Sequence, residues 1–200
     1  MKSTRIIVSL CLTAALLIGV FCIAEAKAGD VFSPIKARRE IENSESGLLQ
    51  YKSANNEKIA KLNAEVNADE DILVTVTFAK PLNENQFTKI VNDYGLKVHH
   101  VLARAVEKDL KRATISLGSQ QDMLINKKYL ENSLLRNEAK FKGFIEVVTY
   151  VPNKNLSNLA NDKLVFLVDP SATKQLTENP RNKFMPGLYW SLEDLKMVLE

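Results

Sequence analysis

The stretch from Ile72 to Gly95 restricts the fold of this chain more than any other. Apolar and polar residues alternate from Ile72 to Phe78, a period that predicts a strand with one buried face. Pro81 is expected to end that strand, because proline has no amide hydrogen to donate to a sheet. Asn83 and Gln86 then have the spacing of a capping box, which predicts a helix closed by Gly95. The apolar residues of this helix recur at helical spacing: Phe87, Ile90, Val91 and Tyr94.

Residues 1–28 have the pattern of a signal peptide or of an N-terminal membrane anchor. Lys2 and Arg5 precede an uncharged apolar run from Ile6 to Ala24, and small residues around Ala26 offer cleavage sites. The run is 19 residues long, which exceeds the core of most signal peptides and approaches the length of a membrane-spanning helix. Both alternatives stay open at this point. Under either one we expect the remaining chain to be secreted or extracytoplasmic.

The part of the chain beyond residue 28 contains no cysteine, because Cys11 and Cys22 both lie in the apolar run. Disulfides, thiolate metal sites and cysteine nucleophiles are therefore excluded there. Three of the 27 basic residues and one of the 24 acidic residues lie in residues 1–28, which leaves 24 and 23. This near-neutral balance argues against a nucleic-acid partner, since phosphate binding needs an excess of lysine and arginine.

Residues 29–70 are polar and lack a strand pattern. Scattered apolar residues between Ile41 and Val66 favour a helix, which we interpret as a solvated helical linker. A short coiled-coil stalk is the alternative, although Asn55 and Lys58 break its heptad. The acidic run from Ala68 to Asp71 ends the linker, so a single α/β domain is predicted over residues 71–200.

The rest of this domain alternates predicted strands with predicted helices. Leu96–Glu107 and Arg112–Gly118 form a strand pair around the polar turn Glu107–Lys111, and Ser119 is positioned to cap a long helix. The remaining elements in chain order are that helix over Gln120–Ala139, a strand over Phe141–Val151, a short helix over Asn155–Asn161 and a strand over Lys163–Asp169.

The last predicted strand is apolar on both faces from Leu164 to Val168, so a further segment should cover its second face. The C-terminal tail is the candidate, with a helix expected to start at Ser191 as cap and Asp194 in the capping-box position. Its apolar residues either complete the core or form a partner-binding patch, because tryptophan and tyrosine are frequent interface anchors. The candidate partner-binding residues are Phe184, Leu188, Tyr189 and Trp190.

The order of predicted elements is the split β-α-β order of the ferredoxin-like fold, with an inserted strand and helix between its halves. We therefore predict an α+β domain with a mixed or antiparallel sheet and helices on one face. The segment from Gly143 to Asp169 resembles the closing half of subtilisin propeptide and inhibitor domains. The residues that carry the resemblance are Gly143-Phe144, Leu156, Leu159, Val165 and Val168-Asp169. It implies a stand-alone protease inhibitor as one function.

No pattern of residues predicts catalysis, a cofactor or a metal. His99 and His100 are adjacent on a predicted strand and point to opposite faces, so they cannot bind one ion together. Glycine-rich phosphate loops, nucleophile elbows and zinc-protease motifs are missing from the sequence. The Asn155-Leu156-Ser157 sequon matters only where the host glycosylates it. Basic residues gather around the predicted turn, where they are either simply solvated or a contact for anionic envelope material: Arg104, Lys108, Lys111 and Arg112.

These observations favour an exported protein that is not an enzyme. We expect it to bind another extracytoplasmic protein or a component of the cell envelope. Contact with the membrane itself is expected only through residues 1–28, if they are retained. The alternative is the extracytoplasmic protease inhibitor of propeptide-like fold.

Overall fold

A computed structural model describes residues 41, 44–118, 124–177 and 187–199. The chain divides into two compact units, Met1–Val31 and Phe32–Glu200, and every described element belongs to the second. The predicted export segment and the candidate residue Phe184 lie outside the described residues. Within the described ranges, no helix has both the length and the apolar character needed to cross a membrane.

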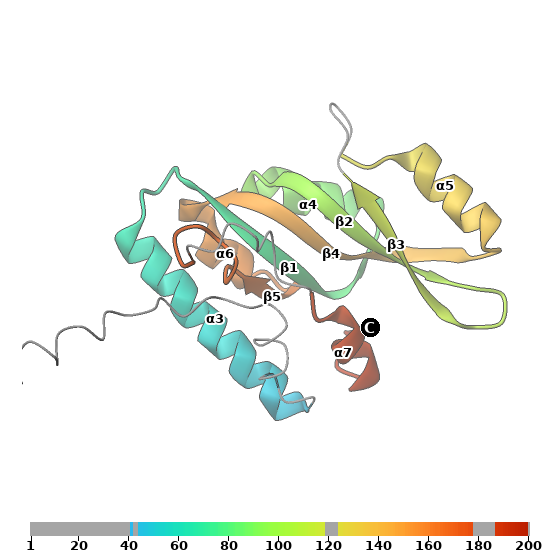
Figure 1. Ribbon diagram of the computed structural model, residues 1–200, viewed down its shortest axis with the longest axis horizontal. Coiled ribbons are helices and arrows are strands. Elements are labelled where there is room, and N and C mark those ends of the chain that lie inside the picture. The colour runs from blue at the N-terminus through green and yellow to red at the C-terminus, as the bar shows by residue number, and fades with distance from the viewer. Residues whose placement is uncertain (1–40, 42–43, 119–123, 178–186, 200) are drawn as a thin grey trace, which may run out of the picture. The chain divides into compact units, whose positions relative to one another are not determined.

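The second unit is an α+β fold built on one antiparallel sheet of five strands (Figure 1). The strands are β1 (Asp71–Leu82), β2 (Lys97–Val106), β3 (Arg112–Gly118), β4 (Lys140–Pro152) and β5 (Val165–Asp169). Their order across the sheet is β3-β2-β4-β1-β5, and each neighbouring pair is antiparallel. The helices are α3 (Glu45–Glu65), α4 (Glu84–Tyr94), α5 (Lys127–Arg136), η1 (Asn153–Asn155), α6 (Leu156–Ala160) and α7 (Tyr189–Asp194).

The predicted strand–helix unit is confirmed as β1 and α4. Asn83 and Gln86 make both bonds of the capping box, and Gly95 closes the helix with a left-handed φ of 65°. Pro81, however, does not end the strand, which runs on to Leu82. The pairing of β1 with β4 is irregular between Thr77 and Leu82, so the missing amide hydrogen of proline falls where the ladder is already interrupted.

Two apolar clusters cover the sheet, one on each face. The larger joins Val76 and Phe78 of β1 to Phe87 of α4 and to Leu156 and Leu159 of α6. The smaller is formed by Leu48, Ala79, Ile145, Phe166, Leu167, Leu188, Tyr189 and Leu192. The prediction that the tail covers the second face of the last strand is therefore confirmed. The prediction of helices on one face only is wrong, because α7 and the start of α3 pack on the other.

Helix α3 differs from the predicted solvated linker because it is packed into the fold. The Ser44 side chain caps the first turn of α3. The two ends of the helix pack into different apolar clusters. Leu48 belongs to the smaller cluster, while Ile59 and Leu62 belong to the larger, so the helix borders the sheet beside β5. Few apolar residues lie along this helix, so the sequence did not predict that it packs against the sheet. Its buried residues are Gly47, Leu48, Asn55, Ile59 and Leu62.

A polar network joins α3 to the end of β5. The Tyr51 hydroxyl donates to Asp169 Oδ2 at 2.7 Å, and Lys58 Nζ donates to Ser171 Oγ at 2.7 Å. Asn55 is fully buried between them and accepts hydrogen bonds from both Lys58 and Ser171. Each buried polar group in this network has a partner, so the network fixes α3 against β5 without an unpaired group.

Alkaline pH should weaken this attachment. Burial first, and then the Asp169 carboxylate, raise the pKa of Tyr51 far above its ordinary value of about 10. The unfolded chain therefore loses this proton at lower pH than the folded chain, so stability is fully present below about pH 10 and falls above it. The slope for one such group is about 1.4 kcal/mol per pH unit. Urea unfolding between pH 8 and about 12 should show a flatter decline for Tyr51→Phe than for the wild type; equal slopes would contradict this prediction.

The β2–β3 hairpin is present as predicted, whereas the helix that follows is shorter than predicted. Helix α5 begins at Lys127 and is capped by Asn126, whose side chain accepts from Tyr129 N at 2.9 Å. Ser119, the expected cap, lies outside the described residues, but residues 124–126 are not helical. Asparagine and serine are both favoured at the N-cap, so the sequence alone does not decide between Ser119 and Asn126 as the start of this helix.

Candidate functional site

Two hydrogen bonds hold the first turn of helix α7 on the sheet. Leu188 N donates to Thr77 Oγ1 at 3.1 Å, and Tyr189 N donates to Glu146 Oε1 at 2.8 Å. The helix thus begins at Tyr189 without a side-chain cap of its own, and the prediction that Ser191 caps it is wrong. Carboxylate and hydroxyl acceptors on the sheet satisfy the amide hydrogens that a cap would otherwise satisfy.

The structure separates the predicted partner-binding residues. Leu188 and Tyr189 are 3% and 1% exposed and belong to the smaller core cluster. Trp190 is 38% exposed on the outer side of the same helix. Of the described candidates, therefore, only Trp190 presents a large apolar surface to solvent.

Arg104 of β2 and Glu193 of α7 form the central ion pair of this site. Arg104 Nε donates to Glu193 Oε1 at 2.9 Å and Nη2 donates to Oε2 at 2.5 Å. The remaining nitrogen donates to Ala113 O at 3.1 Å and to Thr114 Oγ1 at 2.8 Å. Arg104 is only 2% exposed and Glu193 is 16% exposed. A buried guanidinium is tolerated here because a carboxylate fork and two further acceptors surround it.

Trp190 lies against two arginines. The guanidinium carbon of Arg104 is 4.2 Å from the ring centroid, and that of Arg112 is 4.7 Å from it. Arg112 also donates to Asp194 Oδ1 at 2.7 Å and to Glu193 Oε2 at 3.3 Å. The Asp194 hydrogen bond is the main reason why the pKa of Arg112 is raised. Arg112 therefore stays charged while it contacts the indole face.

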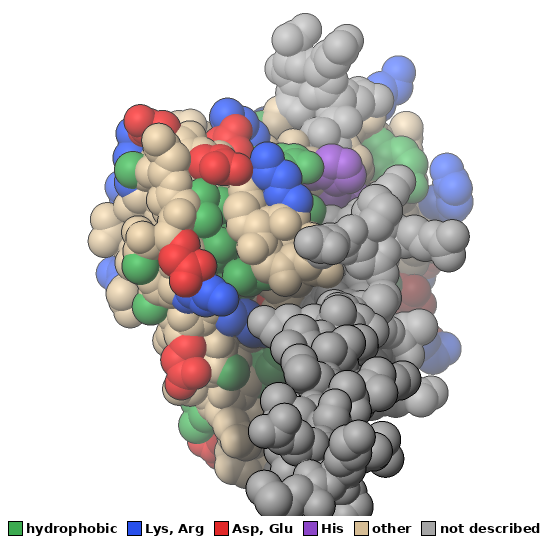
Figure 2. Space-filling model, turned by 60° about the vertical axis from the view of Figure 1, so that its left-hand side comes forward, with side chains coloured by type: hydrophobic (Ala, Val, Ile, Leu, Met, Phe, Trp, Pro, Cys, Tyr) green, Lys and Arg blue, Asp and Glu red, His purple; other side chains and the backbone are tan. Residues whose placement is uncertain are grey.

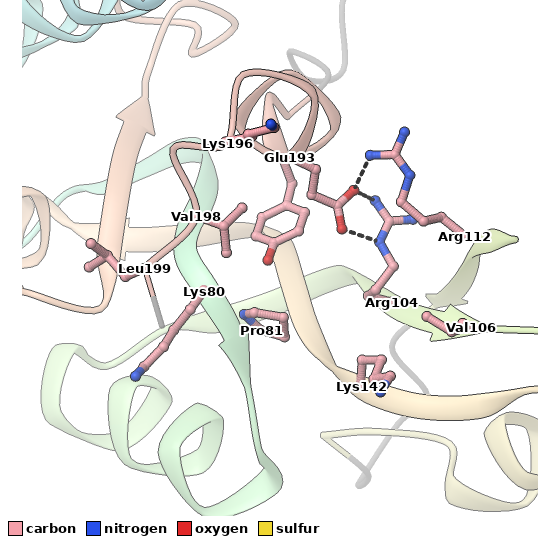
Figure 3. A pocket seen from close by; sticks show the side chains of 11 residues that line it. Lys80, Pro81, Arg104, Val106, Arg112, Lys142, Glu193, Lys196, Val198 and Leu199 are labelled. Atoms are coloured by element: carbon pink, nitrogen blue, oxygen red, sulfur yellow. Dashed lines mark hydrogen bonds and ion pairs between the residues drawn. The ribbon is translucent and has the colours of Figure 1, made fainter. Parts of the chain in front are cut away.

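A groove of about 780 Å³ opens beside this pair, between α7, the C-terminal residues and the ends of β1, β2, β3 and β4 (Figure 3). Its lining includes five cationic side chains and one carboxylate, that of Glu193. Figure 3 shows Glu193 reaching the two arginines across the groove. The cationic residues are Lys80, Arg104, Arg112, Lys142 and Lys196.

The groove combines this positive charge with apolar walls from Pro81, Val106, Val198 and Leu199. Lys142 and Lys196 are exposed and make no ion pair within the described ranges. On the face drawn in Figure 2, by contrast, acidic and basic side chains are interspersed. An anionic group with an apolar neighbour is the ligand chemistry that fits such a lining.

The basic cluster predicted around the turn is divided in the structure. Arg104 and Arg112 turn to the groove and bind α7, whereas Lys108 and Lys111 pair with Glu138 and Asp109 near the turn. His99 is exposed, and His100 Nε2 lies 2.9 Å from Ser116 Oγ. In the part of the chain that the structure covers, no group of three or more metal-ligating side chains comes together.

Sequence reasoning missed most of the groove. Lys80 is the one basic residue of β1, Lys142 is one of two lysines at the start of β4, and Lys196 follows a short helix, so no single stretch of the sequence contains all three. Their proximity depends on the pairing of β1 and β2 with β4, which brings distant segments together. The chain matches no family model, no curated protein and no solved structure, so its function must be inferred from the chemistry of this groove.

Proposed function

We propose that this protein is an exported, non-enzymatic domain that binds an acidic segment of a partner protein in the groove beside α7. One observation carries the proposal: five cationic side chains line a groove in which Arg104 already holds the carboxylate of Glu193. The apolar leader over residues 1–28 supports an extracytoplasmic location for the domain. A partner in that compartment, or an acidic envelope component, would meet this groove.

The lining favours a peptide carboxylate over a bare phosphate polymer. The paired nitrogens of arginine match a carboxylate in two parallel hydrogen bonds, as Arg104 demonstrates with Glu193. Pro81, Val106 and Val198 add apolar contact that a polyphosphate would not use. The exposed face of Trp190 lies next to the same arginines and offers an anchor of the kind common at protein interfaces.

We also propose that the fold is ferredoxin-like with one insertion. The strands β5-β1-β4-β2 have the spatial order and antiparallel pairing of that fold, with α4 and α6 as its two crossover helices. Strand β3 and helix α5 are the inserted elements and extend the sheet beyond β2. Helix α7, which lines one side of the groove, follows the last strand and is not part of the ferredoxin-like order of elements.

Calorimetric titration tests the proposed function. The full chain is titrated with a short peptide that alternates glutamate and leucine, and separately with its glutamine counterpart. We expect binding only to the acidic peptide, with weaker affinity at higher salt. Lys142→Gln should weaken binding about threefold, because one exposed charge pair contributes at most about 1 kcal/mol. Lys163→Gln, an exposed lysine that does not line the groove, should leave it unchanged.

Equal affinity for the two peptides would refute the proposal. Equal weakening by Lys142→Gln and Lys163→Gln would mean that nonspecific charge attracts the peptide. Tight binding of an anionic envelope polymer, without binding of the peptide, would instead assign the groove to the cell envelope.

Protease inhibition is the second candidate function, and the strand order that supports a ferredoxin-like fold also supports it. Purified protein is incubated with a subtilisin-type protease and residual activity is measured. Stable inhibition at micromolar concentration would favour this function. Rapid digestion of the domain by the protease would exclude protease inhibition as its function.

A further inference from the structure

Strand β3 is an outer edge of the sheet. It comes first in the order β3-β2-β4-β1-β5, and among the described strands it forms a ladder only with β2 (Figure 1). The unpaired amide and carbonyl groups of such an edge can bond to a strand of another chain. The opposite edge, β5, has five residues and lies beside helix α3, whereas β3 has seven. Of the two edges, β3 is therefore the longer one.

The hydrogen bonds of the β2–β3 hairpin determine which backbone groups of β3 point outward. Glu107 N donates to Lys111 O at 2.9 Å, so these two residues form a hydrogen-bonded pair. Bonded and non-bonded pairs alternate along an antiparallel ladder, and β2 and β3 pair without a register shift. The backbone groups of Ala113, Ile115 and Leu117 therefore bond to β2. The residues whose amide and carbonyl groups point away from β2 are Arg112, Thr114, Ser116 and Gly118.

The outer side of β3 is open and lacks the features that protect edge strands from pairing. Within the described ranges, no backbone hydrogen bond reaches the outward groups of these four residues. The strand contains no proline, no lysine and no bulge, and its one charged residue, Arg112, is its first. Helix α5 lies near β3, but Leu130 and Leu134 pack against the larger apolar cluster, so the helix covers a face of the sheet.

A second copy of β3 is complementary to this edge in one register. Two β3 strands are placed antiparallel about a two-fold axis at Ile115. Thr114 of one copy then faces Ser116 of the other, and Arg112 faces Gly118. All outward amide and carbonyl groups of both strands are paired in this register. The two Arg112 side chains lie at opposite ends of the strand pair, so no like charges face each other.

The side chains of the two strands also match in this register. Ala113, Ile115 and Leu117 lie on the face of the larger apolar cluster, whereas Thr114 and Ser116 are exposed on the other face. Pairing about Ile115 places apolar side chains beside apolar ones and hydroxyl groups beside hydroxyl groups, and both combinations stabilise cross-strand pairs. The alternation that β3 requires of a partner strand is thus present in β3 itself.

We propose that β3 pairs with β3 of a second copy of this chain and joins the two five-stranded sheets into one continuous antiparallel sheet. The contact is made by main-chain groups at the edge, so it does not depend on the function proposed for the groove beside α7. A single strand pair buries little surface, which places the contact among weak interfaces. The dimer therefore forms at micromolar concentrations and exchanges with the monomer.

Ser116→Pro tests this pairing in the full chain. The Ser116 amide hydrogen points away from β2, so proline removes a hydrogen bond between the copies and none within the sheet. The Ser116 hydroxyl lies 2.9 Å from His100 Nε2, and Ser116→Ala is the matched control for its loss. Sedimentation equilibrium in a density-matched nonionic detergent, which keeps residues 1–28 dissolved, should show a concentration-dependent dimer for the wild type and for Ser116→Ala. The dissociation constant of Ser116→Pro should be about tenfold higher or more, because the two-fold axis doubles the loss to two hydrogen bonds.

Amide hydrogen exchange of the wild type is a second test, which requires no variant to fold. A rise in protein concentration should slow exchange at Thr114 and Ser116, whose amides point outward, and leave it unchanged at Ile115, whose amide bonds to β2. A wild type that stays monomeric, or exchange at Thr114 and Ser116 that does not respond to concentration, would overturn the proposal. Equal association of Ser116→Pro and Ser116→Ala would also overturn it, since association would then arise elsewhere in the chain.

Discussion

Replacing Arg104 by alanine should destabilise the protein by about 3 kcal/mol, because it leaves the poorly exposed Glu193 carboxylate without its main partner. The loss also removes packing against the indole of Trp190 and the hydrogen bonds to β3. The α7 segment should detach before the sheet unfolds. Urea unfolding followed by circular dichroism measures the loss, and the fluorescence of Trp190, the only tryptophan, reports on α7 itself.

Arg112→Ala is the matched control for this prediction. Arg112 contacts the same carboxylate and the same indole, but its side chain is 39% exposed against 2% for Arg104. Its removal should therefore cost less than about 1 kcal/mol. If the two variants lost the same stability, burial of the Arg104–Glu193 pair would not be what holds α7 in place.

Gly143→Ala should be at least as damaging, at about 3 kcal/mol or more. Gly143 has a φ of 145°, and a Cβ atom there would lie 2.7 Å from the carbonyl oxygen of Leu82 and 2.8 Å from Pro81. Strain in the backbone and overpacking against it each cost about 1–3 kcal/mol. The neighbour is main chain of β1, which cannot rotate away. The melting temperature and urea midpoint should both fall.

Gly118→Ala is the corresponding control in the same sheet. A Cβ atom at Gly118 meets nothing within 4 Å, and this residue ends the edge strand β3. Its stability should change by less than about 0.5 kcal/mol. A mild effect of Gly143→Ala, comparable with that of Gly118→Ala, would show that β1 and β4 do not approach as closely as described. The Lys80 and Lys142 side of the groove depends on that approach.

The sequence correctly predicted the elements whose signals lie within a few neighbouring residues. The capping box of Asn83 and Gln86 and the closing Gly95 identified α4, since each signal acts within one helical turn. The apolar run in β5 predicted a cover on its second face, which α7 provides through Tyr189 and Leu192. Pro81 misled the prediction of the end of β1, because an irregular ladder tolerates a proline that a regular one would reject.

The groove and the packing of α3 depend on contacts between distant residues. Arg104 and Glu193 are 89 positions apart, and nothing near either residue identifies its partner. Lys80 and Lys142 approach only because β1 pairs with β4 through an irregular register. Helix α3 looked solvated because its few apolar residues are divided between two clusters, and each contributes to a different face of the sheet. The apolar periodicity of one segment does not show which distant segment packs against it.

The emission of Trp190 during titration with the glutamate–leucine peptide tests the central claim most directly, since this single indole lies against Arg104 and Arg112. A saturable change in its intensity or wavelength is expected with the acidic peptide and should be reduced at high salt, whereas the glutamine counterpart should leave the emission unchanged. Binding detected by calorimetry without any change at Trp190, or an equal change with the glutamine counterpart, would contradict a carboxylate-binding groove beside α7.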